Sequence, residues 1–225
     1  MDAKLSSAQV KVWDPLVRVF HWTLVLAFGT SYLTGDEWDS WGDIHEISGY
    51  LILGLVIFRI IWGFVGSKYA RFSNFIYSPK LVIEYLKSLL TTHPKHYLGH
   101  NPAGGWMVAI LLACLLATTV TGLKVLADEH QEGPLATIEL QLPSLISVAE
   151  ARRIGGQQTE NEEREGDEDE SIWKEVHEFF ANFTLFLVMV HILGVIVSSR
   201  LHKENLVQAM LTGRKTLDNN NDTNP

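Results

Sequence analysis

The chain has 225 residues, of which 47 % are hydrophobic, and its formal net charge is −8. Its single cysteine, Cys114, excludes a disulfide framework and a cysteine-based metal site within the chain. The C-x-x-C-H motif that covalent haem attachment requires does not occur. Residues 1–15 contain no apolar core and no small-residue cleavage site, so we expect no signal peptide.

Four apolar blocks predict an all-α protein, a four-helix transmembrane bundle. The blocks cover residues of about 16–34, 45–65, 104–126 and 176–199. Each has about 20 residues, enough to cross a hydrocarbon core of about 30 Å. Segments in lipid must satisfy their own backbone hydrogen bonds, and helices do so. Asp14-Pro15 precedes the first block and is typical of an N-cap followed by the first helical residue.

The segments between and after the blocks are polar. Residues 78–90 predict a short amphipathic helix, starting with Ser78 and Pro79, that lies flat on the membrane surface. Residues 128–172 form a long loop whose stretch 160–170 carries eight acidic residues and one Arg, which predicts disorder. We assign residues 1–215 to one transmembrane domain and expect 216–225 to be a disordered tail.

The distribution of basic residues predicts how the chain is oriented. Of the 18 Lys and Arg, 13 lie near the N-terminus, at the end of the second block and after it, or after the fourth block. By the positive-inside rule these segments are cytoplasmic, and so are both termini. The acidic loop 128–172 then lies on the outer side.

Four of the nine histidines lie in or at the ends of the apolar blocks. In the expected topology, His21 and His191 share the cytoplasmic half of the membrane, whereas His45 and His177 share the outer side. Two neutral imidazoles at one depth are what bis-histidine ligation of a haem iron requires. The 14 residues between His177 and His191 correspond to about 21 Å along one helix. Depth therefore predicts two haem b sites.

Other interpretations of the histidines remain open. Each could be a satisfied polar residue between helices, and a metal-ion transporter would need carboxylates beside them within the bilayer. His93, His96 and His100 cluster in the cytoplasmic loop and are interpreted as solvated loop residues. His130 and His202 are interpreted as surface residues.

Further polar residues and glycines are candidates for cofactor contacts. Arg59 could pair with a haem propionate, or it could be a snorkelling arginine that sets the topology. Asn101, where the third block begins, could donate to a quinone carbonyl or serve only as an N-cap, and His100 beside it could carry protons. Four glycines could admit a flat macrocycle or allow ordinary helix packing: Gly49, Gly54, Gly122 and Gly194.

Several motifs occur together along most of the chain. They are R-x-F-H-W (18–22), H-E-I-S-G-Y (45–50), R-I-I-W-G-F-V-G-S-K-Y-A-R-F (59–72), G-H-N-P-A-G (99–104), the H-x13-H of 177–191 and A-M-L-T-G-R-K (209–215). In combination they resemble the prokaryotic cytochrome b-561 family, which includes b-type subunits of Ni,Fe-hydrogenases and formate dehydrogenases. The resemblance implies a four-helix bundle in the bacterial inner (cytoplasmic) membrane, with two b haems. Their axial ligands would be His21, His45, His177 and His191.

The resemblance also implies a function. We expect transmembrane electron transfer through two b-type haems between the quinone pool and an outer-side redox partner, either a c-type cytochrome or a hydrogenase-like subunit. An electron-transfer subunit is favoured over a stand-alone enzyme, and no nucleic acid is expected as a partner. The acidic loop could steer a basic partner or act as a solvated tether.

Two alternative functions stay open. One is a stand-alone haem oxidoreductase, such as a superoxide:quinone oxidoreductase, which would need an open basic funnel on the outer face. The excess of acidic residues on that side argues against it. The other is a haem-free membrane scaffold or transporter, which an absorption spectrum would distinguish.

Overall fold

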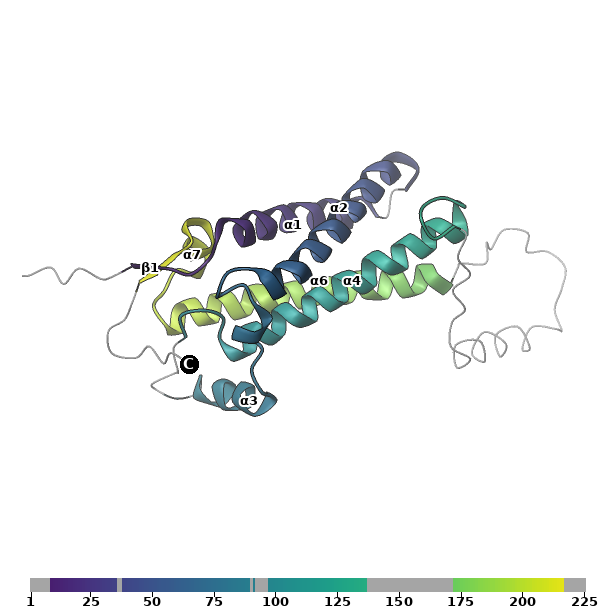
Figure 1. Ribbon diagram of the computed structural model, residues 1–225. Coiled ribbons are helices and arrows are strands. Elements are labelled where there is room, and N and C mark those ends of the chain that lie inside the picture. The colour runs from purple at the N-terminus through teal and green to yellow at the C-terminus, as the bar shows by residue number, and fades with distance from the viewer. Residues whose placement is uncertain (1–8, 36–37, 90, 92–96, 137–171, 217–225) are drawn as a thin grey trace, which may run out of the picture. The chain divides into compact units, whose positions relative to one another are not determined.

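The computed structural model describes residues 9–35, 38–89, 91, 97–136 and 172–216 (Figure 1). Four long helices contain the four apolar blocks: α1 (Pro15–Thr34), α2 (Trp38–Val65), α4 (Pro102–Glu129) and α6 (Ile172–Leu201). Each is long and apolar enough to cross a membrane. In α6 only 6 % of the most apolar stretch is buried within the protein, so this helix needs lipid to cover it. The prediction of an all-α transmembrane bundle is confirmed.

The helices extend beyond the apolar blocks. The second helix begins at Trp38 and the fourth at Ile172, so His45 and His177 lie inside their helices rather than at the first residues. The third helix likewise continues to Glu129, into the segment predicted as loop. Because backbone hydrogen bonds within a helix do not depend on apolar side chains, a helix need not end where its apolar face ends.

Among the described residues, two short helices lie outside the long ones. The helix α3 (Pro79–Ser88) begins after Ser78, as predicted, and turns Tyr85 into the interior at 2 % exposure. The helix α7 (Leu206–Thr212) follows α6 and begins after Asn205, whose side chain accepts a hydrogen bond from Gln208 N–H. A single 3₁₀ turn, η1 (Phe72–Asn74), follows the loop after α2.

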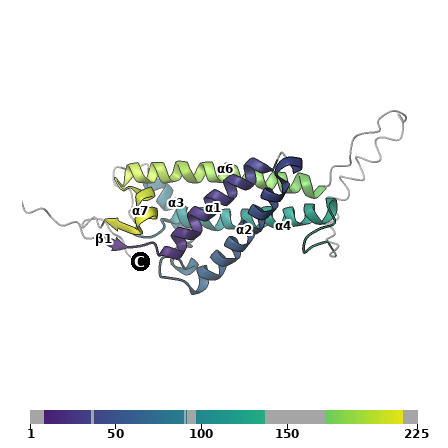
Figure 2. The same ribbon diagram turned by 90° about the horizontal axis from the view of Figure 1, so that it is seen from above.

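A pair of short strands, which the sequence analysis did not predict, joins the two ends of the described chain. The strands β1 (Gln9–Lys11) and β2 (Arg214–Thr216) pair antiparallel, with Val10 opposite Lys215. Figures 1 and 2 show β1, in purple, beside the yellow C-terminal strand. Thr216 therefore belongs to a strand and not to the expected disordered tail; residues 217–225 lie outside the described part.

Gly213 makes this junction sterically feasible. It ends α7 with a positive φ of 81°, and its carbonyl accepts hydrogen bonds from the N–H groups of Val12 and Trp13 at 2.9 and 3.2 Å. A Cβ at this position would lie 2.7 Å from the carbonyl oxygen of Trp13. Glycine therefore satisfies both the left-handed backbone conformation and the close approach of the N-terminal segment.

The described residues belong to two compact units, 1–119 with 180–225, and 120–179. In the first unit, buried apolar side chains of α1, α2 and α4 form one core: Phe20, Ala27, Ile52, Val56, Leu112 and Leu115. The helix α6 joins them through polar contacts. Tyr32 Oη donates to Asn182 Oδ1 at 2.8 Å, and the Oγ1 atoms of Thr118 and Thr184 lie 3.4 Å apart.

The second unit contains the end of α4 and the start of α6. Lys124 and Asp128 form a salt bridge of 2.5 Å, one turn apart on α4. Residues 137–171 of the predicted acidic loop lie outside the described part, so the expectations for its stretch 160–170 stay predictions.

Candidate functional site

The first predicted histidine pair is brought together within the larger unit. His21 lies near the start of α1 and His191 in the second half of α6, and both are half-buried. The two imidazoles are close enough to interact electrostatically. The Nδ1 atom of His21 is buried and has no hydrogen-bond partner among the described residues. Haem iron would bind the Nε2 atom of each imidazole, so the buried Nδ1 atom of His21 is a separate donor for which the described residues supply no acceptor.

Open space beside several glycines could receive a flat macrocycle. A Cβ built at Gly49, Gly54 or Gly194 would meet no atom within 4 Å. Gly194 lies three residues after His191, one helical turn along α6. Ordinary small-residue packing would place neighbouring atoms against these positions, and none is found there. The histidine pair and this space fit a haem group.

Gly122 has a different role from the other predicted glycines. A Cβ at Gly122 would lie 2.9 Å from Cε1 of His177. The neighbouring Thr121 Oγ1 is 3.3 Å from Nδ1 of the same imidazole. These two residues of α4 therefore define where the His177 ring can lie.

His45 is oriented by the end of α1. Its Nδ1 atom lies 2.9 Å from the carbonyl oxygen of Ser31. Since a carbonyl only accepts, Nδ1 carries the hydrogen and Nε2 has the lone pair. Metal-ligating histidines commonly donate their other ring N–H to a backbone carbonyl in this way. The tautomer of His45 therefore suits ligation through Nε2.

Arg59 is a buried cation. The residue is 3 % exposed, and its Nη1 atom has no hydrogen-bond partner in the described part of the chain. Its guanidinium carbon lies 5.2 Å from the ring centroid of Phe72 and 5.7 Å from that of Phe75. A snorkelling arginine extends its head group to solvent, and the buried Arg59 does not do so.

His100 is not the solvated loop residue that the sequence analysis expected. Its ring centroid lies 4.6 Å from that of Trp13 and 4.4 Å from that of Phe75, and its Nδ1 atom is buried without a partner among the described residues. Burial, with the nearby positive charges of Arg59 and Lys215, lowers the pKa of His100 to about 3. The imidazole is therefore neutral at physiological pH. No local sequence signal indicated this, because the packing residues are distant in sequence.

The remaining histidines differ in their exposure. His130 is exposed, as expected, whereas His202 is half-buried. His93 and His96 lie outside the described residues.

Asn101 caps the third long helix. Its Oδ1 atom accepts a hydrogen bond of 2.7 Å from Gly104 N–H, so the N-cap interpretation is confirmed. The phenol of Tyr85 lies near the side chains of both Asn101 and Ser198. Burial raises the pKa of the Tyr85 phenol. These contacts join α3, α4 and α6 around Asn101, and quinone binding by Asn101 stays a prediction.

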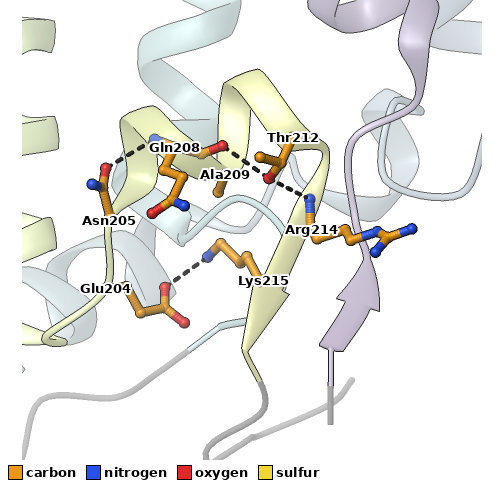
Figure 3. A pocket seen from close by; sticks show the side chains of 7 residues that line it. All are labelled: Glu204, Asn205, Gln208, Ala209, Thr212, Arg214 and Lys215. Carbon is orange, nitrogen blue, oxygen red and sulfur yellow. Dashed lines mark hydrogen bonds and ion pairs between the residues drawn. The ribbon is translucent and has the colours of Figure 1, made fainter. Parts of the chain in front are cut away.

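A polar pocket of about 350 Å³ lies between α7 and β2 (Figure 3). Figure 3 shows Lys215 facing Glu204, at an Nζ–Oε2 distance of 3.1 Å. Lys215 Nζ also lies 3.4 Å from the carbonyl oxygen of Tyr97, and Asn205 caps α7. The ion pair of Lys215 with Glu204 and the cap by Asn205 stabilise the junction of α7 and β2.

Comparisons with known proteins agree with the transmembrane helices. The family model for prokaryotic cytochrome b561 matches residues 12–213. A probable Ni/Fe-hydrogenase B-type cytochrome subunit from Rhizobium leguminosarum bv. viciae is 27 % identical over 153 residues. That match covers 56 % of this chain and 64 % of the relative, so the chain spans less than two thirds of the relative's length. No solved structure matches the chain.

Proposed function

Because the chain belongs to the prokaryotic cytochrome b561 family, we propose that it transfers electrons across a membrane by means of haem b bound within its helical bundle. One observation carries this proposal: α1 and α6 bring the half-buried side chains of His21 and His191 together. When bound, haem b supplies one-electron chemistry, while the protein supplies ligation, burial and tuning.

Each histidine pair has a distinct task in this proposal. His21 and His191 would hold the haem nearer the cytoplasm. His45 and His177, paired by their depth in the sequence, would hold the second. The hydrogen bond from His45 Nδ1 to Ser31 orients that imidazole, and Thr121 with Gly122 confines the ring of His177. Both His177 and His191 belong to α6, in which 14 residues correspond to about 21 Å.

The separation along α6 supports a relay between two sides of the membrane. We propose the bacterial inner membrane as the location, with both termini cytoplasmic. Quinone would react at the cytoplasmic end, and a redox partner, either a c-type cytochrome or a hydrogenase-like subunit, would bind on the outer side. The relative described as a hydrogenase cytochrome subunit supports a partner subunit of this class.

Asn101 and the start of α4 are the proposed quinone contact. The Asn101 Oδ1 atom already accepts from Gly104, so the side chain offers its amide N–H groups. In the first turn of α4, Pro102 has no N–H, and the N–H groups of Gly104 and Gly105 are bonded to Asn101. This leaves the N–H of Ala103 as the further backbone donor. The buried Tyr85 lies close to the Asn101 side chain and belongs to the surroundings of this contact.

Haem analysis of the purified protein tests the proposal. A pyridine haemochrome assay should give two b haems per polypeptide. A protein that folds in detergent, with the expected helical content, but binds no haem would overturn the proposed function. One haem per chain would retain electron transfer but overturn the second site.

A further inference from the structure

Arg59 and His100 both contact Phe75, and each carries a buried nitrogen without a hydrogen-bond partner among the described residues. The Arg59 guanidinium carbon is 5.7 Å from the Phe75 ring centroid, and the His100 ring centroid is 4.4 Å from it. Phe75 itself is 2 % exposed. The unpaired atoms are Nη1 of Arg59 and Nδ1 of His100. Two unsatisfied nitrogens thus lie around one buried ring.

No carboxylate of the described chain forms a salt bridge with Arg59. Asp14 acts on Arg59 electrostatically, but its carboxylate accepts hydrogen bonds from Val17 N–H at 2.9 Å, from Trp62 Nε1–H at 3.3 Å and from the Ser67 hydroxyl. A buried cation that lacks an acceptor is strongly destabilising. Beyond this interaction with Asp14, the Nη1 atom of Arg59 has no acceptor among the described residues, and a further anion would supply one.

The chemistry of the two donors identifies the class of anion. The guanidinium offers a charged N–H, and the neutral imidazole of His100 can offer one uncharged N–H from Nδ1. A carboxylate has two oxygens and can accept from both donors. Trp13 packs on His100, and Phe72 and Phe75 pack on Arg59, so aromatic rings cover both donors. His100 also interacts electrostatically with His191, which links this site to the first histidine pair.

We infer that Arg59 and His100 together bind one carboxylate, a propionate of the haem held between His21 and His191. This inference rests on the proposed function and adds His100 as a second positioning residue. A propionate is covalently part of its macrocycle, so it reaches a covered site that a free solute enters only with difficulty. Lys215 is already paired with Glu204 at 3.1 Å and leaves the carboxylate to the other two donors.

Haem dissociation from the holoprotein tests this inference. Arg59→Gln removes the charge and His100→Phe removes the imidazole donor while keeping an aromatic ring against Phe75. Each should accelerate transfer of the cytoplasmic-side haem to an acceptor globin roughly ten-fold to a hundred-fold, because a hydrogen bond to a charged group is lost. Arg59→Lys and His100→Gln retain a hydrogen-bond donor. Their rates of haem transfer should therefore stay close to the wild-type rate. Arg200→Gln and His130→Phe make the matched changes at exposed positions and should match wild type.

Infrared spectroscopy identifies the carboxylate. Haem labelled with carbon-13 in its propionate carboxylates should show a labelled band that differs between wild type and each of Arg59→Gln and His100→Phe. If only unlabelled carboxylate bands change, a free or protein carboxylate fills the site, and the inference is wrong. Unchanged haem transfer in both variants would also overturn it. Failure of the proposed function looks different, because the wild-type protein would then contain no haem to measure.

Discussion

The Nδ1 atom of His45 lies 2.9 Å from the carbonyl oxygen of Ser31, which ties the imidazole to the last turn of α1. The contact sets the tautomer, since only an N–H can bond a carbonyl oxygen. It also joins two residues 14 positions apart in sequence, across the connection between α1 and α2. His45 is thus oriented by the fold before any metal binds.

The paired ligands predict separable losses. His21→Ala and His191→Ala should each remove one and the same haem signal, and His45→Ala and His177→Ala should each remove the other. Reduced-minus-oxidised spectra with redox titration measure which component disappears. Loss of one common component in His21→Ala and His45→Ala would contradict the pairing.

Gly122→Ala should perturb only the haem that His177 ligates. The added Cβ would lie 2.9 Å from Cε1 of the His177 ring, so the imidazole must shift by a few tenths of an ångström. We expect a shifted electron paramagnetic resonance signal for that haem. The haem of His21 and His191 is the internal control and should keep its signal. An unaltered spectrum for both haems would show that the His177 ring is not confined by α4.

Asn101→Ser separates capping from quinone chemistry. Serine is a good N-cap, so stability should change by less than about 1 kcal/mol, but the amide N–H donors are lost. We expect both haems to remain while electron exchange with a quinol analogue slows at least ten-fold. Asn205→Ser is the matched control, because Asn205 caps α7 through an equivalent bond of 2.8 Å. If Asn101→Ser exchanges at the wild-type rate while an outer-side variant does not, the quinone site belongs on the outer side.

The hydrogen bonds that Asp14 accepts predict that the folded protein loses stability in acid. Burial alone would raise the pKa of Asp14, but hydrogen bonds from Ser67, Val17 N–H and Trp62 outweigh it and lower the pKa below 3.8. A lowered folded-state pKa stabilises the fold above the unfolded value, and this contribution disappears as pH falls through the folded value. In detergent, the midpoint temperature of thermal unfolding should therefore vary less with pH below about pH 4 for Asp14→Asn than for wild type. Asp43→Asn, at an exposed position, should retain the wild-type pH profile.

The sequence alone was sufficient to predict the transmembrane helices and the residue at which α3 begins. A helix in lipid satisfies its backbone within the segment, so an apolar block of about 20 residues predicts it without knowledge of its neighbours. Helix starts such as Asp14-Pro15 and Ser78-Pro79 are likewise local, because the cap by Asp14 and the proline at each first helical position act within the first turn. Depth along the helices predicts two histidine pairs, and the structure brings His21 and His191 near each other. The pairing of His45 with His177 stays a prediction.

Only the tertiary structure decided the surroundings of these histidines. His100 is buried between Trp13 and Phe75, residues from two distant segments, and it had been interpreted as solvated. The pairing of β1 with β2 joins residues more than 200 positions apart, such as Val10 and Lys215. Burial and strand pairing depend on which segments meet in space. A local sequence pattern does not identify those distant partners. It does predict a helix, because the hydrogen bonds of a helix form within the segment itself.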